Sequence, residues 1–361
     1  MKNILQTIRR EVTNIVRTIR RNITVNLLIK FLPFFSFIVP FITLYFLYPK
    51  SFEGDPTWEG YWQGRFLYLF FLWLAFLELI LNWEKLTNKI NRLKSIRTIG
   101  FTVALLLPMI YVIAGNFWGM NTIIANIAMS NNIPHANLMP LASEYFVFSI
   151  FFTFTILLMY GINHLGEFSI SGLFLGLIGI LYTIDNLYPT GQFTPFQILV
   201  PTTASLAANL LRFMGYQTHW IGVSGGMPTF QIWDSLGRPS AAFSIAWPCA
   251  GIESLLLYTV TILLFLKKFV VSWWQKTAYF IVGAIITYFI NILRIATIFI
   301  VSIPYWSTTS AWLQFHNIYG PLYSITWITS YPLIIIGIQA AWRVIRKPRK
   351  LKGNLSNAEI S

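Results

Sequence analysis

The chain has 361 residues, of which 56% are hydrophobic and only 11% are charged, and its mean hydropathy is +0.62. One soluble core cannot bury this much apolar surface, so an ordinary soluble globular protein is excluded. The formal net charge of +14 is also found in nucleic-acid-binding proteins, but in membrane proteins Lys and Arg gather in cytoplasmic loops. We therefore expect an all-α protein that spans the membrane about eight times, with no nucleic-acid partner.

The first 30 residues are predicted to form a basic amphipathic helix on the cytoplasmic side of the membrane. Apolar residues recur at helical spacing from Ile4 to Ile19, and arginines from Arg9 to Arg21 lie between them. No small-residue cleavage site precedes the first long apolar segment, so a cleaved signal peptide is not expected.

Residues 31–190 are predicted to contain five membrane-spanning helices, because five apolar segments there approach the length that crosses a bilayer. These segments are residues 31–48, 64–82, 98–115, 144–163 and 170–188. Five basic residues fall within 83–97, which places that loop in the cytoplasm. The loops 49–63 and 116–143 are then expected at the outer face.

Residues 194–248 are expected to lie at the outer face without crossing the membrane. The stretch 194–214 contains Pro201 and places Leu199, Leu206, Leu210 and Phe213 on one helical face, which indicates an amphipathic helix on the membrane surface. Residues 215–248 alternate apolar and polar side chains around glycine-containing turns, so they are predicted to form a small β-hairpin.

Residues 249–342 are predicted to contain three more spans, at 249–267, 277–303 and 318–342. The basic tail 343–361 and the lysines near residue 270 belong in the cytoplasm, so the first of these spans must begin at the outer face. Counting 194–214 as a ninth span is the alternative, and it would leave Lys267 and Lys268 outside.

Three residues of this last region are candidates for chemistry. Cys249 is the only cysteine and forms no intramolecular disulfide, so it is a buried apolar residue, a metal ligand or a nucleophile. Arg294 lies 18 residues after Lys276, roughly 27 Å along a helix, where it either faces a cavity or extends to the outer headgroups. His316 follows the outer loop, and a single histidine there is a structural residue or a base.

Topology brings these three residues to one depth, at the outer ends of the last three spans. A thiol beside an imidazole forms the thiolate that attacks carbonyl carbons, and a guanidinium stabilises the resulting oxyanion. The combination predicts a cysteine acyl-transfer site.

The segments "PCAGIESL", "NILRIA" and "FHNIYG" carry these three residues, and in this order they resemble the motif blocks of the exosortase/archaeosortase family. The resemblance implies Cys249 as nucleophile, with Arg294 and His316 as its catalytic partners. The chain has Ala250 at a position where the family often has Ser. Some archaeal branches have Arg where this chain has His316, so the resemblance favours the exosortase-like form. Chain length, the basic N-terminus and Glu253 resemble the forms found in ammonia-oxidising archaea.

Four further residues are candidates for supporting roles. Glu253 faces the same side of its helix as Cys249 and either orients the site or stabilises the helix N-terminus. Asn291 is a candidate partner of Arg294, Gly251 is the motif position kept beside Ala250, and His219 of the hairpin is a rival base.

The family resemblance implies substrates that are surface proteins with a C-terminal sorting signal, composed of a short motif, one transmembrane helix and a basic cluster. An amine, such as a membrane lipid headgroup, would accept the cleaved protein. No metal or organic cofactor is expected, since the sequence has no Cys/His cluster and no glycine-rich phosphate loop.

Two other functions remain open from the residues alone. In a transporter or channel, Arg294 and Asp185 would line the substrate path and Cys249 would only pack. In an enzyme acting on lipid or polyprenyl-linked sugar, His316 would act with carboxylates of the outer face.

Overall fold

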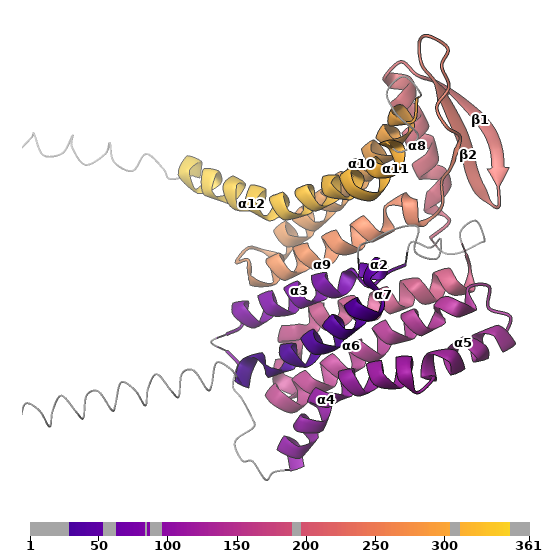
Figure 1. The fold of residues 1–361 in the computed structure, drawn as a ribbon. Coiled ribbons are helices and arrows are strands. Elements are labelled where there is room, and N and C mark those ends of the chain that lie inside the picture. The colour runs from indigo at the N-terminus through magenta and orange to yellow at the C-terminus, as the bar shows by residue number, and fades with distance from the viewer. Residues whose placement is uncertain are drawn as a thin grey trace, which may run out of the picture. The chain divides into compact units, whose positions relative to one another are not determined.

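The computed structural model describes residues 29–52, 63–83, 85–86, 96–189, 196–303 and 311–346. The predicted N-terminal amphipathic helix and most of the basic tail lie outside these residues. The chain divides into two compact units, unit 1 from Met1 to Pro189 and unit 2 from Thr190 to Ser361, which are described separately (Figure 1).

Unit 1 is a bundle of helices that run side by side (Figure 1). Its described elements are Ile29–Leu47, α2 (Pro49–Phe52), α3 (Leu67–Leu81), α4 (Ile96–Phe117), α5 (Met120–Ser130), η1 (Ala136–Leu138), α6 (Met139–Tyr160), η2 (Ile162–Phe168) and α7 (Ser169–Leu187). Each of the five predicted spans coincides with a helix. The segment 116–143, expected as a loop, is largely helical, because α5 continues helix formation directly after α4.

Polar groups inside unit 1 are joined to one another across the bundle. Arg65 forms a buried ion pair with Glu144 at 2.8 Å, and the Tyr68 hydroxyl donates to the same carboxylate at 2.9 Å. The Glu78 carboxylate of α3 accepts hydrogen bonds from the backbone amide of Ser171 at 3.0 Å and from its hydroxyl at 2.6 Å, at the start of α7. In an apolar surrounding such pairing is required, because an unpaired buried charge is costly.

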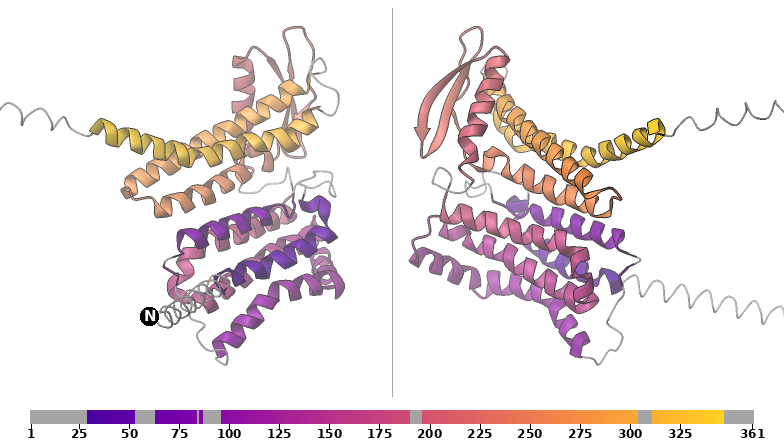
Figure 2. Two further views of the ribbon diagram at one scale, coloured as in Figure 1. Left: turned by 60° about the vertical axis from the view of Figure 1, so that its left-hand side comes forward. Right: turned by 180° about the vertical axis from the view of Figure 1, so that it is seen from behind.

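Unit 2 contains a small sheet and the last three long helices. Its elements are α8 (Leu199–Phe213), β1 (Gln217–Ser224), β2 (Met227–Trp233), β3 (Phe243–Ser244), η3 (Pro248–Ala250), α9 (Ile252–Lys268), α10 (Trp273–Val301), α11 (Ala311–Gln314), η4 (Phe315–Tyr319) and α12 (Gly320–Arg346). In both views of Figure 2, α8 and the sheet lie at one end of α9, α10 and α12.

The predicted hairpin is present as β1 and β2, and the short β3 extends it to a three-stranded antiparallel sheet. Only Gly225 and Gly226 separate the first two strands, and both have positive φ angles, +57° and +82°. A two-residue turn with two positive φ angles matches the twist of a hairpin, and glycine adopts it without steric cost. The sheet packs on α10, where the rings of Phe230 and Phe299 stack with centroids 4.2 Å apart.

The buried face of helix α8 is rich in small residues. It differs from the predicted apolar face with Leu199, Leu206, Leu210 and Phe213, called the leucine stripe. The buried residues are Val200, Thr203, Ala204, Ala207, Ala208 and Leu211. They contact α10 and the sheet, and the Thr203 hydroxyl shares a hydrogen bond of 2.7 Å with Tyr288 of α10. Leu206 and Phe213 of the leucine stripe are exposed, as a helix lying on a membrane surface requires. Its place at the outer face stays a prediction.

Six helices are long and apolar enough to cross a membrane, by length and composition, within the described residues. The other two predicted spans correspond to α3, with 15 residues, and α9, with 17. The structure is thus mostly helical with one small sheet, which confirms the expected class of a multi-spanning all-α membrane protein.

The three long helices of unit 2 pack against one another through aromatic and aliphatic side chains. Tyr258 of α9 and Tyr331 of α12 belong to one buried cluster beside α10. Their hydroxyls donate to the backbone carbonyls of Phe280 and Tyr279, at 2.8 Å and 2.7 Å. Gly283 of α10 makes room for both rings, since a β-carbon there would overlap the Tyr258 hydroxyl and lie 2.5 Å from Tyr331 Cε1.

We expect Gly283→Ala to lower the melting temperature of the purified protein, because overpacking this contact costs about 1–3 kcal/mol. Gly337→Ala is the matched control, since a β-carbon at Gly337 on α12 meets no atom within 4 Å. Removing a helical glycine there should leave the melting temperature unchanged or raise it. The measurement is thermal unfolding in detergent by tryptophan fluorescence; equal effects of the two substitutions would contradict this packing.

Candidate active site

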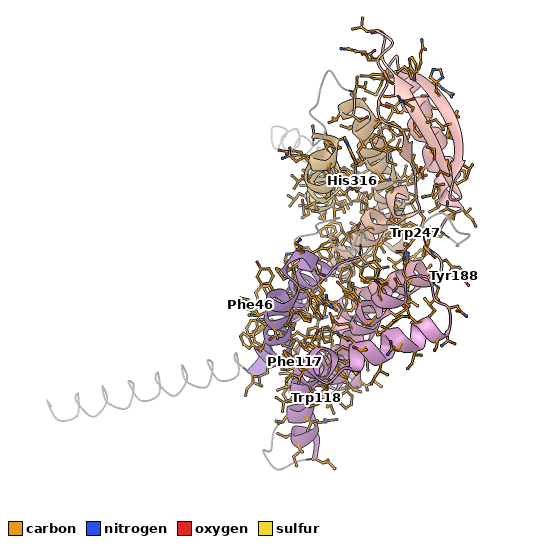
Figure 3. All side chains as sticks on the ribbon, turned by 45° about the vertical axis from the view of Figure 1, so that its right-hand side comes forward. Phe46, Phe117, Trp118, Tyr188, Trp247 and His316 are labelled. Carbon is orange, nitrogen blue, oxygen red and sulfur yellow. The ribbon has the colours of Figure 1, made fainter. Side chains whose placement is uncertain are left out.

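The candidate site lies where the start of α9, the last third of α10 and the start of α12 meet. The four residues between α9 and α10 reverse the chain, and α12 packs against both helices. The N-terminal ends of α9 and α12 therefore lie beside the C-terminal part of α10. Figure 3 labels two residues of this region, Trp247, two positions before Cys249, and His316, just before α12.

Cys249 lies in η3, the short helical turn that leads into α9. Its amide donates to the carbonyl of Ala246 at 3.1 Å, and its side chain is half-buried. The Cys249 carbonyl accepts a hydrogen bond of 2.9 Å from the Asn291 side chain of α10. Asn291 was a candidate partner of Arg294, and the described hydrogen bond connects it instead to the backbone that carries the thiol.

Gly251 links η3 to α9 with a φ angle of +92°, which most L-residues adopt only under strain. A β-carbon at Gly251 would also lie 3.0 Å from Asn291 Cγ. The glycine therefore serves two needs at once, the turn in the backbone and the close approach of the Asn291 amide.

Arg294 lies on α10, one helical turn after Asn291, and its side chain is half-buried. Its Nη2 donates to the backbone carbonyl of His316 at 3.2 Å. Nε is buried and has no hydrogen-bond partner within the described residues. A β-carbon at Gly320 would lie 2.6 Å from this Nε, so Gly320 gives the guanidinium its space beside α12.

His316 lies in η4, a π-helical turn formed by Phe315–Tyr319, and is half-buried. Such turns are rare and concentrate at functional sites. The bond from Arg294 reaches the main chain of His316, so Arg294 fixes the turn that holds the histidine.

Charged neighbours act on the Cys249 thiol from α9 and α10. Burial raises the pKa of the Cys249 thiol, the positive charge of Arg294 lowers that pKa, and the negative charge of Glu253 raises it. Only the thiolate is nucleophilic, so Arg294 favours the reactive form of Cys249 and Glu253 opposes it.

His219, the rival base, lies on β1 and is exposed. Its ring is 5.3 Å from that of Trp233 on β2, and no described contact joins it to Cys249. The structure thus joins Asn291 to the backbone of Cys249 beside Gly251, and it joins Arg294 to the backbone of His316. Arg294 and Glu253 lie within electrostatic range of the thiol, and His219 lies on the sheet.

Two features of the site had no assigned role in the sequence. Gly320 ends the motif "FHNIYG", and its role depends on the neighbouring guanidinium, which only the fold reveals. Ser254 and Ser324 share a buried hydrogen bond of 3.1 Å that ties the start of α9 to the start of α12. Among the described residues, no group of three or more His, Cys, Asp or Glu side chains could hold a metal ion.

Comparison with protein families matches residues 34–331 of the chain to the transmembrane exosortase family. The chain belongs to this family. It is therefore a membrane enzyme of the exosortase type, a class of transpeptidases, and the match reaches the family but no finer branch of it. No significant match is found among curated proteins or solved structures.

We expect the two charged neighbours to move the pKa of the only thiol in opposite directions. Arg294→Gln removes a cation that stabilises the thiolate, so the pKa of Cys249 rises; Glu253→Gln removes an anion, so it falls. The measurement is the rate of iodoacetamide alkylation against pH, followed by protein mass.

Arg212→Gln is the matched control, because Arg212 is exposed on α8 and bonds Thr218, away from the thiol. For Arg212→Gln, the pH at which the alkylation rate reaches half its maximum should equal that of the unmodified chain. A shift in the same direction for Arg294→Gln and Glu253→Gln would refute the electrostatic account.

Proposed function

We propose that the protein is a cysteine transpeptidase in which Cys249 is the nucleophile, His316 the general acid and base, and Arg294 the oxyanion-binding group. The observation that carries this proposal is the meeting of three separate motif segments at one end of α9, α10 and α12. Lipid-facing arginines need no such connections, and the contacts of Arg294 with Gly320 and the His316 carbonyl favour a role inside the site.

In the proposed reaction, His316 takes the thiol proton and the Cys249 sulfur attacks the carbonyl carbon of the peptide bond. Arg294 stabilises the negative charge on the carbonyl oxygen, because its guanidinium is half-buried and keeps its positive charge near the thiol. The carbon–nitrogen bond then breaks, His316 gives the proton to the leaving amine, and a thioester to Cys249 remains.

An acceptor amine completes the cycle by attacking the thioester carbonyl. His316 takes a proton from the acceptor amine, the new amide bond forms and the carbon–sulfur bond breaks, and His316 passes that proton to the Cys249 sulfur to restore the thiol. We infer that a membrane lipid headgroup supplies the amine, because the reaction would then replace a peptide anchor by a lipid anchor.

We infer that the substrates are surface proteins that end in a short motif, one transmembrane helix and a basic cluster. The basic clusters of this chain favour cytoplasmic termini and a start of α9 at the outer face. A substrate helix with its basic end inside would present the peptide bond before it to Cys249 at the outer surface.

The contacts in unit 1 favour an enzyme over a transporter. Glu144 accepts from Arg65 and Tyr68, Glu78 accepts from Ser171, and Asp185 accepts from Gln63 at 3.0 Å. These carboxylates are engaged in bonds that join separate segments of unit 1, as structural groups are, whereas a transport path needs groups that can bind and release cargo.

Cys249→Ala and Cys249→Ser should both abolish processing of surface proteins, since a serine hydroxyl forms far less nucleophile than a thiol at neutral pH. Arg294→Lys should lose most activity, because an ammonium cannot reproduce the planar guanidinium. The measurement is the intact mass of candidate surface proteins, from cells carrying each variant in place of the native gene.

Arg212→Lys is the matched control for Arg294→Lys and should process normally. Processing that persists in Cys249→Ala would exclude the thioester and favour one of the other two functions, a transporter or channel or an enzyme acting on lipid or polyprenyl-linked sugar. If Arg294→Lys processed surface proteins at the normal rate, Arg294 would have no catalytic role and would only extend to the lipid headgroups.

His316→Ala should slow processing by at least about 10²-fold, the usual contribution of a general base, whereas His219→Ala should not. His219 lies on the exposed sheet against Trp233, so its loss leaves the described contacts of Cys249 intact. The measurement is the rate of appearance of the shortened surface protein. If His219→Ala slowed processing and His316→Ala did not, the general base would be His219 on the sheet. If both variants were fully active, Arg294 alone would activate the thiol.

A further inference from the structure

A groove runs along one face of α12, directly beside the candidate site. It has a volume of about 680 Å³ and is lined by seven side chains of η4 and α12, from Phe315 to Ser330. Phe315 is the neighbour of His316, so the groove begins at the site. Ser330 lies 15 residues after Phe315, which corresponds to roughly 22 Å of helix. This length is most of the ~30 Å thickness of the hydrocarbon layer of a membrane.

The groove lies mostly on a face of α12 that the rest of unit 2 leaves uncovered, with Phe315 buried at one end and Trp327 hydrogen-bonded to Thr287 of α10 at one edge. The face packed on α9 and α10 carries Ser324, Ile328 and Tyr331, each at most 4% exposed. The groove residues Tyr319 and Tyr323 are 54% and 50% exposed. The groove face is therefore available to a partner from the membrane without disturbing the three-helix packing.

Hydroxyl groups make this groove unlike an ordinary lipid-facing surface. Tyr319, Tyr323, Thr326 and Ser330 all line it, and none of their hydroxyls has a hydrogen-bond partner among the described residues. Hydrocarbon chains offer no acceptor to these groups, and intramembrane polar side chains usually face protein. The chemistry of the groove suits a polypeptide better than an acyl chain.

We propose that the α12 groove binds the transmembrane helix of the protein to be cleaved. This inference rests on the proposed function, because the peptide bond must reach Cys249. The peptide bond to be attacked precedes the substrate helix, so the first turn of that helix lies near Cys249, where its backbone N–H groups have no partners within the helix. Tyr319 and Tyr323 offer such partners near the site, and Thr326 and Ser330 allow close helix packing farther along.

The test places a photoreactive phenylalanine derivative at Tyr323, in the full chain carrying Cys249→Ala so that bound substrate is not consumed. Ile325 is the matched control position: it is 47% exposed, against 50% for Tyr323, but two residues later on the helix it points about 200° away. Intact cells that lack the native copy are irradiated, and the cross-linked peptides are sequenced.

We expect the Tyr323 probe to capture hydrophobic C-terminal segments of surface proteins, at least about tenfold more than the Ile325 probe, the ratio that 1.4 kcal/mol of preference produces. Cross-links to lipid alone, to a second copy of this chain, or to nothing would overturn the proposal. So would equal capture at the two positions.

A second arm measures processing without a probe. Tyr323→Ala should slow the shortening of surface proteins about tenfold, as the loss of a central aromatic contact does, whereas Ile325→Ala should stay within about twofold of the unmodified chain. Equal rates for the two variants would contradict the groove as the binding site.

Failure of the groove and failure of the reaction give different results. Capture of C-terminal segments at Tyr323 without Cys249-dependent shortening would retain the groove and exclude the transpeptidase chemistry. Cys249-dependent shortening without capture would retain the chemistry and exclude the groove.

Discussion

The hydrogen bond from Asn291 to the Cys249 carbonyl is the contact on which the geometry of the site depends. It joins the turn that carries the thiol to α10, one helical turn before Arg294. Gly251 makes the bond possible, because only a residue without a β-carbon leaves the amide enough space. The distance between nucleophile and guanidinium is thus set by one rigid helix and one short turn, an arrangement that favours precise positioning.

The same constraint operates at the other side of Arg294. Its guanidinium bonds the backbone of a π-helical turn and packs on Gly320, so His316 is positioned through the main chain. A side chain held in this way costs little to reorganise when charge develops nearby, which is the physical basis of electrostatic catalysis. Two glycines and two side chains of α10 therefore define most of the site.

Hydropathy and charge were sufficient to predict the six membrane-length helices of the described residues and the shorter helices α3 and α9, since lipid as solvent requires continuous apolar segments with their hydrogen bonds satisfied internally. The ordered motifs led to Cys249, Arg294 and His316 because each is an expensive or chemically unusual residue in its context. The hydrogen bond from Asn291 to the Cys249 carbonyl could not be predicted, because it depends on how α9 and α10 are rotated against each other. The Arg65–Glu144 pair, 79 residues apart in sequence, also needed the fold, and α5 was too short for a hydropathy signal.

The length of α10 has a consequence for how the enzyme would respond to its membrane. The helix has 29 residues, and Arg294 lies roughly 32 Å from its first residue, close to the ~30 Å thickness of a typical hydrocarbon layer. Bilayers differ in thickness by a few ångströms, and a helix of fixed length answers by tilting or by changing its depth. A thicker bilayer would enclose the guanidinium in hydrocarbon and a thinner one would expose it to water, so lipid composition itself would tune the acidity of the neighbouring thiol.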